Sequence, residues 1–105
     1  MRDYTTIIVG AGSAGAVIAA RMTESSDHNV LLIDAGPDYA HPSALPSDLA
    51  NGKRNSLVHH DWNYKHRPND HQHTFRLPRG RVVGGSSAVN TCIALRGCPE
   101  DYDEW

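Results

Sequence analysis

The sequence predicts an α/β protein that opens with a strand, helix, strand unit of the Rossmann type. Two short β-branched segments, residues 4–9 and 29–33, are typical of buried parallel strands. Between them, apolar residues recur at nearly helical spacing behind the motif Gly10-Ala-Gly12-Ser-Ala-Gly15. A right-handed crossover in such a unit places the helix N-terminus at the carboxyl end of the first strand.

The first glycine loop has the spacing of a phosphate-binding turn. Gly10 allows a tight turn, Gly12 lets the backbone approach a pyrophosphate, and Gly15 lets the helix pack closely on the strand. Ser13 and Ala14 supply backbone amides at the helix start, where the helix dipole favours an anion. We therefore expect all five residues to bind a dinucleotide.

Asp34 ends the second strand, at the place where an acid can accept hydrogen bonds from both hydroxyls of a ribose. We interpret Asp34 and the adjacent Ala35 as cofactor-binding residues. The acid disfavours a 2′-phosphate, which argues against NADP. The alternative is an ordinary strand-end acid that caps the next turn.

Residues 35–78 form a polar segment interrupted by prolines, and we predict an irregular, ordered excursion with a brief helix at 47–51. The pairs His59-His60 and His71-x-His73 have spacings that a metal could use. No cysteine or carboxylate cluster completes a shell in the sequence, so solvated loop histidines are favoured and no metal site is assigned.

Residues 79–105 contain a second glycine-rich loop and the start of a helix. Arg79 and Arg81 precede the pair Gly84-Gly85, and the following serines add hydroxyl donors. Two phosphate-handling loops in one chain indicate a site for a large dinucleotide. Further on, Pro99 and the acidic residues behind it predict the first turn of a helix that is still unfinished at the end of the chain.

Composition excludes several function classes. The 105 residues have a formal net charge of −2 and a pI near 6.3, which gives no electrostatic case for binding nucleic acid or an anionic membrane surface. No apolar run approaches the roughly 18 residues of a spanning helix. Cys92 and Cys98 form no disulfide framework, so reduced thiols in a cytoplasmic protein are the simpler interpretation.

From Tyr4 to Trp105 the combined pattern resembles the glucose-methanol-choline (GMC) family of flavin oxidoreductases, most closely its choline dehydrogenase and choline oxidase branch. The resemblance implies that these residues are the N-terminal βαβ portion of an incomplete, FAD-binding Rossmann-like domain. The substrate domain and the catalytic histidine then belong to the remainder of a longer polypeptide. No catalytic residue is assigned here, and we expect the 105 residues alone to be unstable and inactive.

The resemblance also implies cofactor contacts, residue by residue. Residues 35–78 cover the flavin, and Trp62 either approaches the flavin or lies buried in the core. The second loop contacts the diphosphate and ribityl region through Arg79, Val83, Gly84, Gly85 and Ser86. The segment beside the isoalloxazine ring is Asn90, Thr91, Cys92 and Ile93. Arg81 and Arg96 either contact the cofactor or are merely solvated or paired with surface acids.

Val89 occupies the position at which some choline-oxidising relatives carry a histidine linked to the flavin. Valine cannot form that bond, so the resemblance implies non-covalent FAD. The implied reaction is oxidation of choline or another small primary alcohol by hydride transfer to the flavin. An NAD-binding dehydrogenase or dinucleotide-binding module built on the βαβ unit alone, and a GMC-like lyase without redox chemistry, are the alternatives.

Overall fold

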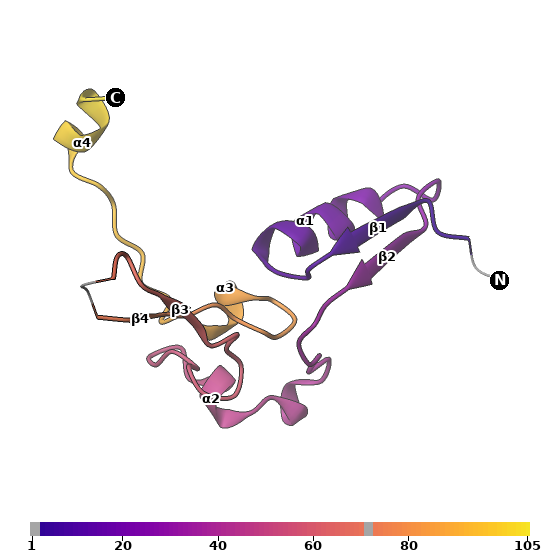
Figure 1. The fold of residues 1–105 in the computed structure, drawn as a ribbon. Helices are drawn as coiled ribbons and strands as arrows, with labels where there is room; N and C mark the ends of the chain where they lie inside the picture. Colours follow the sequence, from indigo (N-terminus) through magenta and orange to yellow (C-terminus); the bar gives the residue numbers. More distant parts are fainter. Residues whose placement is uncertain (1–2, 71–72) are drawn as a thin grey trace.

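A computed structural model of the chain describes residues 3–70 and 73–105. Its first part is a βαβ unit made of β1 (Thr6–Val9), α1 (Ser13–Met22) and β2 (Val30–Ile33) (Figure 1). The two strands pair in parallel, with Thr6 opposite Val30. The predicted parallel strands and intervening helix are therefore confirmed.

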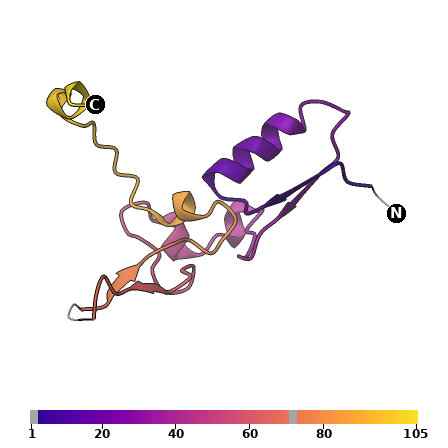
Figure 2. The ribbon, with the colours of Figure 1, turned by 45° about the horizontal axis from the view of Figure 1, so that its top comes forward.

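Only one face of this two-stranded sheet is covered by a described element. Helix α1 lies along that face (Figure 2). On the other face the side chains of Ile7 and Val9 are 60% and 83% exposed. The expectation that both strands are buried is therefore wrong for the described residues, because burial on both faces requires a second covering layer.

The excursion after β2 contains more regular structure than expected. A short 3₁₀ turn (Pro42–Ala44) leads into α2 (Ser47–Ala50), which confirms the predicted brief helix. Strands β3 (Tyr64–His66) and β4 (Phe75–Leu77) then form an antiparallel hairpin. The prediction of an irregular chain was wrong for this hairpin, because each strand has only three residues, which is too short for a period-two pattern to stand out.

The last part of the chain contains two short helices. Helix α3 (Ser86–Val89) follows the second glycine loop, and an extended segment leads from it to α4 (Pro99–Asp103) (Figure 1). The Asp101 carboxylate accepts a 3.0 Å hydrogen bond from the Cys98 N–H at the start of α4. The predicted helix start at Pro99 is confirmed, and the helix itself ends at Asp103.

The small core lies between the excursion and the second glycine loop. No large side chain of the described residues is fully enclosed; the buried apolar and polar residues are Ala11, Val82, Val89, Ser56, His60 and Asp61. A Cβ on Gly36 would overlap the Val82 backbone, and the Val83 N–H donates to the Pro37 carbonyl at 3.0 Å. These backbone contacts bring the end of β2 directly against the second glycine loop.

Candidate functional site

The first glycine loop is shaped by two glycines that no other residue could replace without strain. Gly10 has φ +95°, and its N–H donates a 2.7 Å hydrogen bond to the Ile33 carbonyl. A Cβ on Gly15 would overlap the Gly10 carbonyl oxygen and come within 3.3 Å of the Ile8 side chain. The first turn of α1 is thereby held against the end of β1.

The second glycine loop packs directly on the first. The Gly84 N–H donates to the Ala11 carbonyl oxygen at 2.8 Å. Gly85 has φ +57°, and a Cβ added to it would lie 2.9 Å from the Gly12 Cα. Two loops that are far apart in the sequence therefore form a single backbone surface with almost no side chains on it.

Both loops line one cavity of about 420 Å³. Its wall combines glycine backbone, aliphatic side chains, one acid and one aromatic ring: Val9, Gly10, Gly12, Ile33, Asp34, Ala35, Trp62, Gly80 and Gly85. Gly12 is the N-cap of α1 and has no side chain that could cap the helix start. The amides of the first turn therefore remain available to an anion.

The Asp34 carboxylate joins the first glycine loop to the turn that follows β2. One carboxylate oxygen accepts the Ala11 N–H and the other accepts the Gly36 N–H, each at 2.7 Å. The turn-capping role that the sequence left open is thus present in the structure. A carboxylate has roughly four lone-pair sites, so these two bonds leave acceptor capacity on the side that lines the cavity.

Trp62 is positioned by a backbone ladder that extends the β3–β4 hairpin. Its N–H donates to the Arg79 carbonyl at 3.0 Å, and the neighbouring residue pair Asp61 and Gly80 forms a β-bridge. The Trp62 side chain is 41% exposed. Among the described residues Trp62 is therefore partly exposed at the cavity wall and not enclosed in the core.

Asp61 anchors this ladder, and no motif in the sequence pointed to it. Its buried carboxylate accepts the Arg79 N–H at 2.8 Å and a side-chain hydrogen bond from Arg76 at 3.2 Å. The hydrogen bond from the Arg79 N–H lowers the pKa of Asp61 below its usual value. Burial raises this pKa, but by less. The Arg79 guanidinium itself donates to the Pro78 carbonyl at 2.7 Å.

A second cavity of about 410 Å³ collects other predicted residues. Val83, Asn90 and Cys92 line it together with residues of the excursion such as Tyr39 and Asp48. The Asn90 side-chain oxygen accepts the Cys92 N–H at 2.7 Å, and Cys92 adopts φ +54°. The remaining predicted residues line neither of these two cavities: Ser13, Ala14, Gly15, Arg79, Gly84, Ser86, Thr91 and Ile93.

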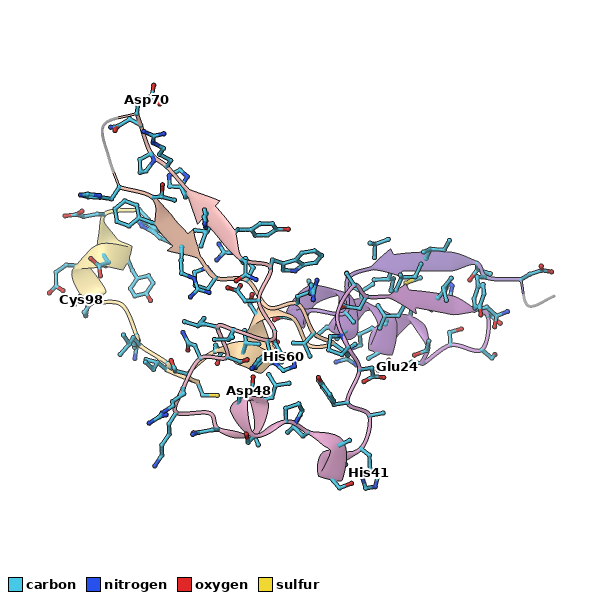
Figure 3. All side chains as sticks on the ribbon, turned by 60° about the horizontal axis from the view of Figure 1, so that its bottom comes forward. Glu24, His41, Asp48, His60, Asp70 and Cys98 are labelled. Carbon is cyan, nitrogen blue, oxygen red and sulfur yellow. The ribbon has the colours of Figure 1, made fainter. Side chains whose placement is uncertain are left out.

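His60 is the centre of a buried polar cluster that sequence reasoning missed. Its Nδ1 lies 2.9 Å from Asp48 and 3.1 Å from the Ser56 hydroxyl, and its Nε2 lies 3.0 Å from the Tyr39 hydroxyl. Figure 3 shows His60 and Asp48 side by side. The prediction of a solvated loop histidine was wrong for His60, because Asp48, Ser56 and Tyr39 satisfy its two ring nitrogens and allow it to be buried.

Electrostatics within this cluster favour an ionised Asp48. The hydrogen bond from the Ser56 hydroxyl holds the pKa of Asp48 below its usual value, and His60 lowers it further. His59 and His73 are exposed, and His71 lies outside the described residues. Across residues 3–70 and 73–105, no group of three or more His, Cys, Asp or Glu side chains is arranged to hold a metal.

Within the described chain, no helix has the length and apolar character needed to cross a bilayer. Cys92 and Cys98 are free thiols, and both are exposed.

Comparison with known proteins gives consistent matches. A family model described as GMC oxidoreductase matches residues 4–105. The mitochondrial choline dehydrogenase of Mus musculus is 40% identical over 115 residues, which cover 98% of this chain and 19% of that protein. The chain thus spans about a fifth of the length of this curated relative.

Solved structures show the same similarity. The crystal structure of pyridoxine 4-oxidase from Mesorbium loti matches with a TM-score of 0.73 and 33% identity, over 98% of this chain and 20% of that one. A formate oxidase of Aspergillus oryzae RIB40, studied for modification of its FAD, matches with a TM-score of 0.71 and 28% identity. The match covers 97% of this chain and 18% of that one.

Proposed function

The chain belongs to the GMC oxidoreductase family, and from this premise we propose that it forms the FAD-binding part of an enzyme that oxidises a small alcohol. The observation that carries the proposal is the contact between the two glycine loops at one cavity. When bound, FAD would supply the hydride acceptor for oxidation of the alcohol.

The residues of this chain bind and orient the cofactor. The backbone amides of Gly12, Ser13 and Ala14 would hold the pyrophosphate, and Asp34 would accept hydrogen bonds from the ribose of the adenosine half. The backbone of Gly85, which lines the same cavity beside Gly12, would lie against the cofactor, and the absence of a side chain there leaves room for it.

The segment from Asn90 to Ile93 continues toward the isoalloxazine ring in this proposal. Asn90 is held by its own turn through the Cys92 N–H, so its side chain has a defined place near the second cavity. Proton transfer from the alcohol is assigned to a base outside this chain. The described histidines are accounted for by the His60 cluster or by exposure at the surface.

The substrate class follows from the family and its choline-oxidising relatives. The mouse relative is named for choline, and we propose choline or another small primary alcohol as substrate here. An NAD-binding module explains only the βαβ unit, whereas the family match extends through both glycine loops. A GMC-like lyase is not favoured, because the similar proteins named above are a dehydrogenase and two oxidases.

FAD attachment is proposed to be non-covalent at the second loop. Val89 is 7% exposed, and its side chain has no nucleophilic atom. We propose the cytoplasm as the location, because exposed reduced thiols such as Cys92 persist in a reducing compartment. The mouse relative, by contrast, is named as mitochondrial.

The proposal is tested with the protein as its gene encodes it. The purified protein should show the visible absorption bands of a bound flavin, and choline or a similar alcohol should bleach them when oxygen is excluded. Tight binding of NAD with no flavin absorption would overturn the proposal. If the protein contains bound flavin that no alcohol reduces, the proposed cofactor is supported and the proposed reaction is rejected.

A further inference from the structure

The buried cluster around His60 holds both ends of segment 81–89, which contains the second glycine loop. At one end the Arg81 N–H donates to the His60 carbonyl oxygen at 2.9 Å. At the other end the Ser56 N–H donates to the Val89 carbonyl oxygen at 3.2 Å. We propose that the Ser56 and His60 side chains form a clamp that sets the position of the second glycine loop for cofactor binding. This inference rests on the proposed function, because it assigns positioning residues to the same site.

The two clamp residues are joined to each other through their side chains. The Ser56 hydroxyl lies 3.1 Å from His60 Nδ1, and both groups bind the same carboxylate oxygen of Asp48 (Figure 3). The Tyr39 hydroxyl lies 3.0 Å from the other ring nitrogen, Nε2. Ser56 and His60 are each only 3% exposed, so the loss of one partner leaves a buried polar group unpaired. A change in either side chain therefore affects both ends of segment 81–89.

An acid, a histidine and a serine in contact also suggest a nucleophilic serine, but the geometry does not fit that role. In a catalytic triad the histidine binds the serine through one ring nitrogen and the acid through the other. Here the Ser56 hydroxyl and the Asp48 carboxylate both lie at Nδ1 of His60. The hydroxyl is also buried. These contacts fit a positioning role.

The clamp fixes the part of the chain that meets the first glycine loop. Between the two clamped ends, the Gly84 N–H donates to the Ala11 carbonyl oxygen at 2.8 Å. Gly85 lies against Gly12, and both line the cavity of about 420 Å³. A site that already has its binding geometry loses less conformational entropy when the ligand binds. Loosening the clamp should therefore weaken cofactor binding, although neither clamp side chain lines that cavity.

The first measurement needs no ligand. Amide hydrogen exchange is compared, peptide by peptide, in the protein as its gene encodes it, freed of flavin. In Ser56→Ala and His60→Leu we expect exchange in segment 81–89 to become about 5- to 100-fold faster, the scale of a buried polar group left unpaired. Exchange in α1 should keep its wild-type rate. Unchanged exchange in segment 81–89, or equal acceleration in α1, would overturn the inference.

FAD affinity is then measured by titration of the same proteins. We expect FAD to bind about 5- to 100-fold more weakly to Ser56→Ala and His60→Leu. His60→Asn should recover most of the affinity, because its amide N–H replaces Nδ1–H as the donor to Asp48. His59→Leu, at the exposed neighbouring histidine, is the matched control and should leave the affinity unchanged. Ser56→Ala removes only one hydroxyl and provides the test if His60→Leu fails to fold.

The outcomes separate the clamp from the cofactor. Wild-type FAD affinity in folded Ser56→Ala would overturn the inference. An affinity of His60→Asn no better than that of a folded His60→Leu would also overturn it. If the wild-type protein binds no FAD while exchange still changes only in segment 81–89, the proposed function is rejected and the clamp on the loop is supported.

Discussion

The Gly84 N–H donates a 2.8 Å hydrogen bond to the Ala11 carbonyl oxygen and thereby joins the two glycine loops of the chain. No side chain lies between the loops at this point, because Gly12 and Gly85 face each other next to it. The cavity that we assign to the cofactor is therefore bordered by backbone whose spacing depends on the absence of Cβ atoms.

Gly85→Ala should separate the loops. The added Cβ would lie 2.9 Å from the Gly12 Cα, closer than real Cβ contacts, and residue 85 has a positive φ that L-residues rarely adopt. We expect FAD binding to weaken at least tenfold, measured by titration of the apoprotein. Gly52→Ala is the matched control, since its Cβ would make an ordinary 3.5 Å contact with Cys92. Equal affinities in the two variants would contradict this account.

Gly12→Val should abolish FAD binding while leaving the fold intact. In the structure a Cβ at residue 12 meets only the Gly85 Cα, at 3.8 Å, and φ −76° suits any residue. The space that valine fills is the space we assign to the pyrophosphate. Gly15→Ala should instead damage the fold, because its Cβ overlaps the Gly10 carbonyl oxygen. Circular dichroism and flavin content distinguish the two effects, and stoichiometric flavin in Gly12→Val would show that the loop is not the phosphate site.

Asp34→Ala should weaken FAD binding by about 1 to 3 kcal/mol, the scale of lost charge-assisted hydrogen bonds. The variant also frees the N–H groups of Ala11 and Gly36, so the loop itself loosens. Asp34→Asn separates the roles, because its amide oxygen can still accept one N–H while the negative charge is gone. Calorimetric affinities of all three proteins measure this, and identical values would leave Asp34 with only its capping role.

Asp61 should make the protein sensitive to acid. Its pKa is lowered in the folded state, so its stabilising contribution is present above the unfolded value of about 3.9 and is lost as the pH falls through the folded pKa. Asp61→Asn should melt at a lower temperature at pH 7, and the difference from wild type should shrink near pH 3. Asp103→Asn, at an exposed position in α4, is the control. If the difference in melting temperature between Asp61→Asn and the wild type does not change with pH, the Asp61 carboxylate is not the source of the acid sensitivity.

Acid precipitation of the holoprotein should release all of its flavin. Val89 has no nucleophilic atom and cannot bond to the isoalloxazine ring. The yellow colour should therefore appear in the supernatant, quantified by its absorbance. Colour in the protein pellet would reveal a covalent link through another residue.

Local pattern was sufficient to predict the βαβ unit and the helix start at Pro99. Glycine spacing, β-branched runs and a proline followed by acids are short-range signals, and the corresponding elements β1, α1, β2 and α4 are present. A ligand shared by the two glycine loops was predicted from their motifs, but their direct backbone contact was not. Its geometry depends on backbone packing that no local window contains.

The hairpin and the buried histidine could not be predicted in this way. β3 and β4 are aligned by Asp61, whose carboxylate accepts a backbone N–H from Arg79 across the ladder. His60 is buried because Asp48, Ser56 and Tyr39 meet around it. Polar groups that satisfy one another over long sequence separations leave no periodic trace.

The bond between Gly84 and Ala11 also has a consequence for folding. It closes a chain segment that contains the whole excursion, and ordering such a long loop opposes folding by its entropy. The ladder between residues 60–62 and 79–81 shortens that loop, so we expect the hairpin to form before the glycine loops meet. A cofactor that binds only the closed arrangement then shifts the folding equilibrium toward it. Flavin supply during synthesis would thus set how much of the protein escapes proteolysis.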